Sequence, residues 1–367
     1  MNSNMVCRRF CDLPSSTDKF LDKNSGSNIF YSFPWYHNFV QHIDGIQEQF
    51  RAFSVSQSMG NTNTDANLDP DALLLMRAVV GTKFQTRKLE SMANYYTSLF
   101  GPTINLSATD LGGTCNGLAT AIADDRPGWD QVNLNPMARD TPTFDAMNNA
   151  LLGSGFKTEP YFCFGNWYLK TKGRSFDEYF EGLPSKLKNT VNRKRKQLES
   201  GKRGRFEIVT AGDALENAIA TYEKIYSSSW KVPEPYPRFI RGLIRTCSDQ
   251  GWLRLGVAYV DNIPAAAQIW IVYKGIANIY KLAYDERFTK TSVDSILTTN
   301  LMWHVMDVDQ VHEVDYLTGD DSYKRDWMSD RRERWGILAY NLRTPQGLVL
   351  AGMNTLRNAA KRALGRP

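Results

Sequence analysis

Carboxylates, a phenol and an amine are concentrated in one short segment of the second half of the chain. The segment contains Asp315, Asp320, Asp321, Tyr323 and Lys324. Carboxylates can accept protons, a tyrosine hydroxyl can donate one, and a lysine ammonium can bind phosphate or orient a carboxylate. A hydrophobic run that predicts a strand ends just before the segment, and α/β folds place ligands beyond the ends of strands. The residue types therefore indicate either a proton-transfer site or a polar turn in which Lys324 pairs with an aspartate in solvent.

A second group of cationic and hydroxyl side chains lies at the start of a predicted helix over residues 292–308. Its members are Arg287, Lys290, Thr291, Ser292 and Ser295. Backbone N–H groups at a helix N-terminus attract phosphate, so the group can form an anion site. A helix that is merely capped by Ser292 or Thr291 explains the same residues without a ligand.

The elements that must position both groups follow one another in a specific order. Hydrophobic periodicity and turn residues predict three antiparallel strands, a helix and a further strand, over residues 252–260, 265–273, 276–284, 292–308 and 313–317. The three strands carry the aromatic side chains of Trp270, Tyr280 and Tyr284. Core packing is the ordinary role of such residues, and a ligand channel is the alternative.

The first half of the chain alternates between predicted strands and helices. The strands are expected over 49–56, 72–80, 129–134 and 161–169, and the helices over 89–99, 111–123 and 143–153. This alternation is typical of an α/β layer. A chain of 367 residues is long enough for two domains, which we expect at 30–164 and 165–345 after a flexible polar leader at 1–29.

The net charge of +5 is unevenly distributed. Residues 165–205 carry 12 Lys or Arg against 4 Asp or Glu, a net charge of +8, whereas the remaining segments carry −4 and +1. Most of this charge lies on a predicted helix within 186–205, where it surrounds the helix axis. This pattern favours a solvated surface over contact with tRNA or an anionic membrane, so a nucleic-acid partner is the weaker hypothesis.

The two ends of the chain bear on its location. The N-terminus has no apolar signal segment and no window is long and apolar enough to span a bilayer, which predicts a cytoplasmic protein. Residues 346–367 predict a basic amphipathic helix with Val349, Met353, Leu356 and Ala360 on one stripe and Arg357, Lys361 and Arg362 opposite. Such a helix can pack on its own domain or lie peripherally on an anionic membrane.

Three stretches carry a resemblance to a known family. They are Leu183–Glu199, then Ile279–Phe288 with Ser292, Ile296 and Leu297, and then Asp315–Trp327. Together with the order of the predicted elements, they make the second domain resemble the GNAT acyltransferases, in the branch of the CelD-type cellulose-biosynthesis proteins, which are kin to the FemAB peptidyltransferases. The first domain resembles the family only in its element order, as a degenerate second copy does. The resemblance implies tandem GNAT-like α/β domains, each with a mixed, largely antiparallel sheet flanked by helices.

The resemblance also implies a reaction. An acyl group would pass from acyl-CoA to an amine by direct attack, without a covalent enzyme intermediate and without a metal. Asp315 or Asp320 would act as base, Tyr323 would protonate the thiolate or hold the carbonyl, and Lys324 would neutralise charge. The donor phosphates would lie at Arg287, Lys290, Thr291, Ser292 and Ser295, and Trp270, Tyr280 and Tyr284 would line the channel for an acyl chain or a sugar. The acceptor would be an amino sugar or polysaccharide precursor, or a long-chain lipid amine.

One position departs from the family pattern. The family usually has glycine where this chain has Asp294, and a carboxylate in the first helical turn repels phosphate. Two rival functions follow: a Fem-like ligase that uses aminoacyl-tRNA, and a GNAT-fold binding protein that has lost donor binding.

Overall fold

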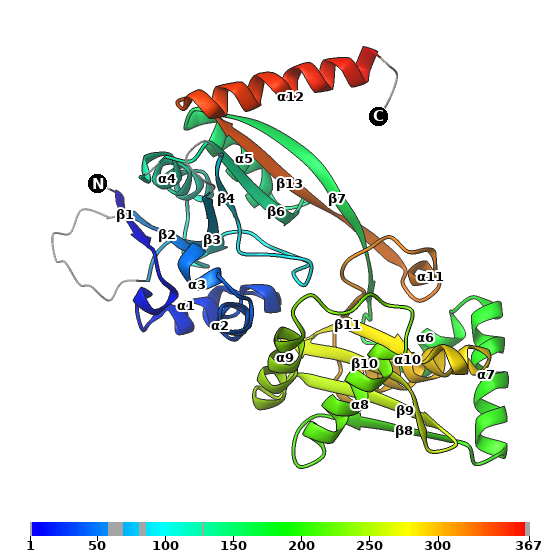
Figure 1. Ribbon diagram of the computed structural model, residues 1–367. Helices are drawn as coiled ribbons and strands as arrows, with labels where there is room; N and C mark the ends of the chain where they lie inside the picture. Colours follow the sequence, from blue (N-terminus) through cyan, green and yellow to red (C-terminus); the bar gives the residue numbers. More distant parts are fainter. Residues whose placement is uncertain (1, 58–68, 81–85, 127, 364–367) are drawn as a thin grey trace. The chain divides into compact units, whose positions relative to one another are not determined.

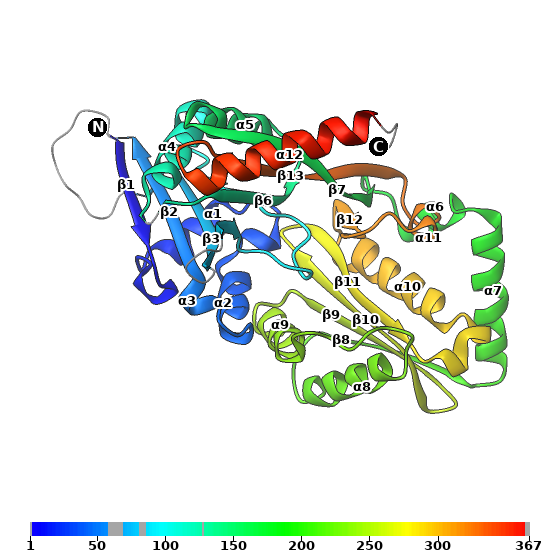
Figure 2. The same ribbon diagram turned by 45° about the horizontal axis from the view of Figure 1, so that its top comes forward.

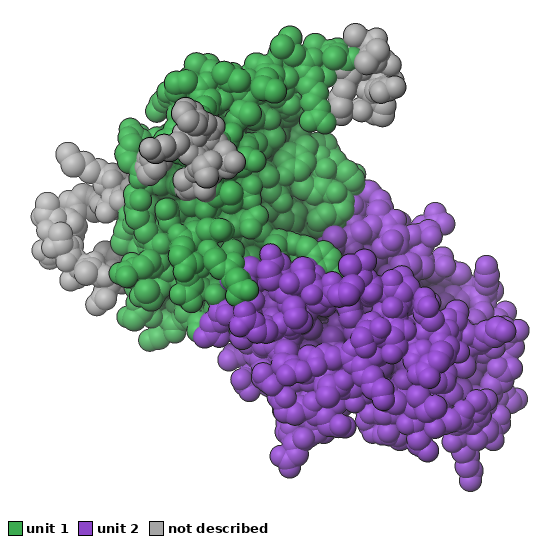
Figure 3. Space-filling view, viewed as in Figure 1, with its two compact units in different colours: residues 1–40, 44–164, 333–367 green, residues 41–43, 165–332 purple. Residues whose placement is uncertain are grey.

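The computed structural model describes residues 2–57, 69–80, 86–126 and 128–363, so residues 364–367 of the predicted tail lie outside the described part. The chain divides into two units, coloured separately in Figure 3. Unit 1 comprises residues 1–40, 44–164 and 333–367, and unit 2 comprises residues 41–43 and 165–332. The divisions at 164/165 and 332/333 fall inside two long strands, β7 (Phe156–Lys170) and β13 (Asp330–Asn341).

The sheet of unit 1 has the strand order β1-β2-β3-β4-β6-β13. Apart from β13, these strands are β1 (Asn2–Cys7), β2 (Phe50–Gln57), β3 (Ala72–Val80), β4 (Arg87–Ser91) and β6 (Gln131–Ala138), and β5 (Thr103–Ile104) pairs with β3. The helices are α1 (Thr17–Asn24), α2 (Phe33–His42), α3 (Ile46–Gln49), α4 (Leu111–Asp124), α5 (Pro142–Gly153) and α12 (Pro345–Ala363), with short 3-10 turns at Phe10–Asp12 and Ile29–Tyr31 (Figure 1).

The sheet of unit 2 has the strand order β7-β12-β11-β10-β9-β8. The remaining strands are β8 (Gly204–Val209), β9 (Leu253–Val260), β10 (Ile263–Tyr273), β11 (Ile276–Tyr284) and β12 (Glu313–Asp315). The helices are α6 (Phe176–Glu181), α7 (Ser185–Ser200), α8 (Leu215–Ser227), α9 (Pro237–Asp249), α10 (Val293–Trp303) and α11 (Ser322–Arg325), with a 3-10 turn η3 (Glu286–Thr291) before α10 and a π turn (His304–Val308) after it.

The helices of unit 2 cover both faces of its sheet. Apolar side chains of α6, α7 and α10 pack with those of β9, β10 and β11 in one core that includes Val191, Trp270 and Leu297. The helices α8 and α9 lie on the other face (Figure 2). The predicted fold class and the order of three antiparallel strands, a helix and a strand are confirmed. Among the helices of the described residues, none is long and apolar enough to cross a bilayer.

Three expectations differ from the structure. The predicted helix over 89–99 is wrong, because residues 87–91 form β4, whose Leu89 and Ser91 are buried while Lys88 and Glu90 are only partly so. The predicted flexible leader over 1–29 is largely ordered: β1 pairs with β2, and α1 buries Phe20. Residues 333–345, which the sequence assigns to the second domain, belong to unit 1 because β13 pairs with β6 over 334–340.

Candidate active site

The sheet of unit 2 forks between β11 and β12. These parallel strands pair over only three residues, Ile276–Asn278 against Glu313–Asp315. Beyond them β11 continues to Tyr284 alongside β10. The chain after β12 instead follows β7, because Tyr316 N–H donates to Trp167 O (2.9 Å) and Gly319 bridges to Asn166. The two strands therefore separate at Asn278 and Asp315, just where the predicted polar segment begins.

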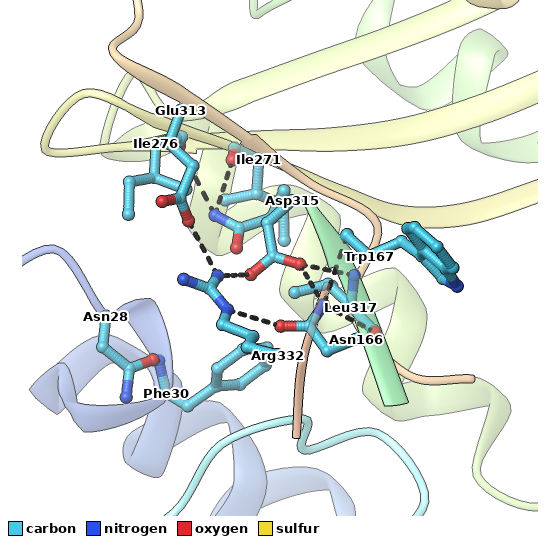
Figure 4. Close-up of polar contacts among 11 residues, drawn as sticks. Asn28, Phe30, Asn166, Trp167, Ile271, Ile276, Glu313, Asp315, Leu317 and Arg332 are labelled. Atoms are coloured by element: carbon cyan, nitrogen blue, oxygen red, sulfur yellow. Dashed lines mark hydrogen bonds and ion pairs between the residues drawn. The ribbon is translucent and has the colours of Figure 1, made fainter. Parts of the chain in front are cut away.

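A buried ion-pair network lies at the base of this fork (Figure 4). Arg332 on β13 binds the carboxylate of Asp315 and, at 2.7 Å, that of Glu313. The Arg332 Nε also donates to Asn166 Oδ1 (2.7 Å), and Asn166 in turn donates to Asp315. The same Asp315 oxygen that accepts from Asn166, Oδ1, also accepts the Leu317 N–H at 2.7 Å, while Oδ2 binds Arg332. Both oxygens of Asp315 are thus engaged in fixing the turn after β12, an arrangement that favours a positioning role for this residue.

A group of titratable side chains lies further along the fork. Tyr316 is fully buried, and its ring meets that of Tyr323 edge-on at 5.8 Å. The Tyr323 side chain is 44% exposed, and partial desolvation together with the nearby carboxylates of Asp321 and Asp294 raises its pKa to about 12. Burial also raises the pKa of Asp294, on the first turn of α10. The fork therefore combines a neutral phenol that can donate a proton with a carboxylate that accepts one more readily than an exposed aspartate does.

Lys324 is buried and holds the turn between β12 and α11. Its Nζ donates to the carbonyl oxygens of Tyr316 (3.5 Å), Thr318 and Gly319 (3.4 Å), and it lies 3.4 Å from Asp321 Oδ2. Burial lowers the pKa of Lys324, while Asp321 opposes this shift.

Asp320 has different partners from the rest of the predicted catalytic set. It accepts from Trp167 Nε1 and Arg331 Nη2, both at 2.7 Å, and it is partly exposed. The hydrogen bonds from Arg331 hold the pKa of Asp320 below its ordinary value. A carboxylate in this state is a weak proton acceptor.

The side chains of the predicted phosphate loop interact mostly with residues of the same loop. The guanidinium of Arg287 donates to both carboxylate oxygens of Asp285, with donor–acceptor distances of 2.5 to 3.0 Å. Ser292 has a positive φ of 53° at the junction of η3 and α10 and makes no side-chain cap. The carboxylate of Asp294 lies in the first turn of α10. The first amides of α10, which the sequence expects to bind a donor phosphate, therefore have an anionic side chain beside them.

A small basic pocket lies beside this loop. It has a volume of about 90 Å³ and is lined by Lys290 and Thr291 of the loop, by Lys194, Gln197 and Leu198 of α7, and by Arg203. Arg203 is paired with Asp261, and the other two basic residues of the lining are Lys194 and Lys290. This is the place among the described residues of unit 2 where two predicted phosphate ligands meet the basic helix α7.

The three predicted channel aromatics occupy different environments. Trp270 is completely buried in the core, where its Nε1 donates to Gln268 Oε1 (2.8 Å). Tyr280 and Tyr284 are partly buried on β11. The Tyr284 ring stacks obliquely on the half-exposed ring of Trp230, with centroids 4.6 Å apart. Tyr284 is therefore better placed than Trp270 to contact a ligand.

Sequence reasoning missed Lys231, which lies on the segment between α8 and α9. Its ammonium lies over the rings of Trp230 (5.7 Å) and Tyr226 (6.0 Å). Burial, reinforced by the positive charge of Lys281, lowers the pKa of Lys231 to about 8. The charges of Lys324 and Asp321 also act on the pKa of Lys231, so its ammonium lies near the fork. A lysine between an exposed tryptophan and a run of prolines carries no signal of this in the sequence.

Comparisons with known proteins agree with this geometry. A sequence model of the acetyltransferase (GNAT) domain matches residues 185–325. The crystal structure of FemX superposes with a TM-score of 0.62 at 9% identity, over 95% of this chain and 99% of FemX. No curated protein is similar enough in sequence to match.

Two further solved structures have the same fold. L-PGS from Bacillus licheniformis gives a TM-score of 0.52 at 12% identity, over 95% of this chain and 97% of its own. A tandem GNAT protein from the clavulanic acid biosynthesis pathway gives 0.50 at 10% identity, over 92% and 98%. The predicted recognition of a tandem, Fem-related GNAT fold is confirmed, whereas nothing in these matches selects the CelD-type branch.

Proposed function

We propose that the chain transfers an acyl group from a CoA thioester to an amine by direct attack, since residues 185–325 match the sequence model of the acetyltransferase (GNAT) domain. The observation that carries this proposal is the fork between β11 and β12. Asp294, Tyr323 and Lys324 are the polar side chains of this fork. Helix α10, which bears Asp294, directly follows the loop whose Lys290 lines the basic pocket.

The proposed reaction needs two proton transfers. The amine nitrogen attacks the thioester carbonyl carbon, and the excess proton on nitrogen passes to the Asp294 carboxylate, directly or through water. The carbon–sulfur bond then breaks, and the thiolate receives a proton from the Tyr323 hydroxyl. The raised pKa values of both residues favour these roles, because Asp294 gains basicity and Tyr323 keeps its proton at neutral pH. In this proposal Asp315 and Asp320 hold the turn that bears Tyr323.

The donor phosphates would bind in the basic pocket rather than on the first amides of α10. Lys194 and Lys290 supply positive charge there, and Thr291 lines the same pocket. The thioester would extend from this pocket along α10 toward the fork. Arg287, Ser292 and Ser295 would contribute less, since Arg287 is paired with Asp285 and the Asp294 carboxylate lies in the same first turn of α10 as Ser295.

Ligand-induced stabilisation tests the donor. Calorimetry and thermal unfolding with CoA, acetyl-CoA and a long-chain acyl-CoA should show binding, and Lys290→Ala should weaken it about tenfold. Gln250→Ala, on the surface after α9, serves as the control. No response of the wild-type protein to any of the three compounds would overturn the CoA proposal.

The acceptor class follows from the donor that binds. Stabilisation by the long-chain thioester alone would favour a lipid amine, whereas equal stabilisation by acetyl-CoA would favour an amino sugar or a polysaccharide precursor. Release of free thiol in the presence of each class of amine, monitored with a thiol reagent, separates these two acceptors.

One observation favours a second candidate function, a Fem-like transfer from aminoacyl-tRNA. The Asp294 carboxylate lies in the first turn of α10, beside amides that could otherwise face a pyrophosphate, while α7 offers a long basic surface for a larger polyanion. This candidate predicts binding of charged tRNA that falls steeply with salt, and activity that ribonuclease abolishes. CoA binding that is insensitive to ribonuclease would exclude it.

A further inference from the structure

The C-terminal helix α12 is fastened to unit 1 by its polar face. Lys157 of β7 donates to Ala351 O at 3.4 Å and to the Thr355 hydroxyl. Asn358 donates to Glu159, also of β7. Ala351 is buried, so the side of α12 at 351, 355 and 358 is the one that faces the sheet.

The opposite face of α12 is apolar and exposed. Val349, Met353 and Leu356 are 61%, 63% and 73% exposed, and their spacing of four and three residues places them on one stripe. Leu348, at the edge of the stripe, is 53% exposed. A surface helix of a globular protein ordinarily turns such a stripe toward the core. Here the stripe points away from the sheet, along the outer side of unit 1 where Figure 1 draws α12 in red.

The charge of this segment is of one sign. Residues 345–367 contain Arg357, Lys361, Arg362 and Arg366 and no Asp or Glu. Arg357 is exposed, and helical geometry places it about 80° from Val349, at the border of the apolar stripe. An apolar stripe with cations at its border suits an interface that is apolar inside and negatively charged at its surface.

We propose that α12 binds the surface of an anionic phospholipid bilayer, with Val349, Met353 and Leu356 inserted among the acyl chains and Arg357 at the phosphates. A second copy of the chain fits less well for two reasons. Two such helices would bring cations of like sign together, and one stripe of four side chains is small beside the roughly 800 Å² that each partner of a stable interface buries. The proposal is independent of the acyl donor and of the acceptor.

Vesicle co-sedimentation of the full chain tests the proposal. Binding is expected to phosphatidylcholine vesicles that contain about one third phosphatidylglycerol, and to be at least tenfold weaker for pure phosphatidylcholine. Met353→Asp should weaken binding to the anionic vesicles about tenfold or more. Leu106→Asp, which adds the same charge at a side chain that is 74% exposed on a turn of unit 1, should bind as the wild type does.

Arg357→Glu separates the electrostatic contribution and keeps the test valid if Met353→Asp fails to fold. It should lose most of the preference for anionic vesicles while its thermal unfolding stays unchanged. Absence of vesicle binding, equal binding to both vesicle types, or unchanged binding of both variants would overturn the proposal. A dimer in light scattering that Met353→Asp dissociates would assign the stripe to a second copy instead.

Discussion

The two units contain the same kind of fork between parallel strands, and the side chains around the two forks differ. In unit 1 the parallel strands β4 and β6 pair over three residues, Lys88–Glu90 against Gln131–Asn133, and α4 connects them. In unit 2 the parallel strands β11 and β12 also pair over three residues and are connected by α10. Each fork has an antiparallel neighbour on its far side, β13 for β6 and β7 for β12.

The contents of the two forks differ. In unit 1 the Ser91 hydroxyl donates to Asn133 O (3.3 Å) and accepts from Asn135 N–H (2.8 Å), and Phe100 N–H donates to Pro136 O (2.6 Å). The chain itself therefore bridges this fork. In unit 2 the corresponding place holds Tyr323, Lys324 and Asp294, with shifted pKa values. The comparison teaches that the fork is a property of the fold, whereas the titratable lining is what makes one copy a candidate site.

Removal of the proposed proton donor gives the largest expected effect on activity. Tyr323→Phe should lower thiol release from acyl-CoA about 10²-fold or more at saturating substrate, because the leaving thiolate loses its acid. The Kd for CoA should stay within about twofold, since the ring is retained. Stopped-flow or steady-state thiol detection and calorimetry measure the two quantities.

The matched control lies in the other fork. Ser91→Ala removes a hydroxyl that bridges the strands of unit 1, so it should lower stability by about 1 kcal/mol and leave turnover unchanged. Equal losses of turnover in both variants would contradict the proposal that the reaction takes place at the fork of unit 2 and not at the fork of unit 1.

Substitution of two neighbouring arginines tests whether buried ion pairs stabilise the base of the fork in unit 2. Arg332→Met leaves Asp315 and Glu313 buried without their cation, and the free energy of unfolding should fall by about 3–5 kcal/mol. Arg331→Met breaks only the partly exposed pair with Asp320 and should cost about 1 kcal/mol or less. Urea unfolding of both variants compares them, and similar losses would contradict a structural network centred on Arg332.

Local chemistry explains which parts of the fold the sequence predicts. The strands predicted over 252–260, 265–273 and 276–284 lie within two residues of the bounds of β9, β10 and β11, because their turns have φ above zero at consecutive residues, Asp261 with Asn262 and Lys274 with Gly275. Near β13 hydrophobic periodicity predicts a strand only over residues 339–342, because the first half of β13 carries charges whose burial depends on partners distant in sequence. Hydrophobic periodicity cannot register an arginine that is buried by ion pairs.

The same limit applies to the candidate site. The sequence selects Tyr323 and Lys324 through the resemblance to the GNAT acyltransferases, because their residue types alone also fit a polar turn. It reads Asp294 only as a departure from a glycine, since the burial that raises its pKa comes from the folded surroundings. It gives no signal for Lys231, whose pKa depends on charges of two other segments, Lys281 on one and Asp321 with Lys324 on the other.

Asp294 should limit CoA affinity because its carboxylate lies in the first turn of α10, close to the loop whose Lys290 and Thr291 line the basic pocket, and repels the donor phosphates. Asp294→Gly and Asp294→Asn should bind CoA about tenfold more tightly, because they remove an anion next to the donor phosphates. Turnover should fall in both variants if Asp294 is also the base. Calorimetry at fixed ionic strength measures the affinity.

The control is again the equivalent helix of unit 1. The carboxylate of Asp110 caps α4 by accepting Gly113 N–H at 2.8 Å, so Asp110→Asn should leave CoA affinity unchanged. Weaker CoA binding by Asp294→Gly would show that the carboxylate supports the donor site instead of blocking it.

The smallest expected effect is a pH dependence of stability at Lys231. Its pKa is about 8 in the folded protein against 10.5 for an unperturbed lysine. Between these values the unfolded chain binds the proton and the folded chain does not, so this residue makes stability rise with pH across the window and contributes no slope well below pH 8. Lys231→Met should remove that rise while every other titrating group is retained. The difference in the free energy of unfolding between wild type and variant, followed by urea denaturation from neutral pH to about pH 9.5, isolates the contribution. A difference that stays constant over this range would contradict the expectation. It would mean that Lys231 is solvated in the folded protein and that burial, Lys281 and Lys324 do not lower its pKa.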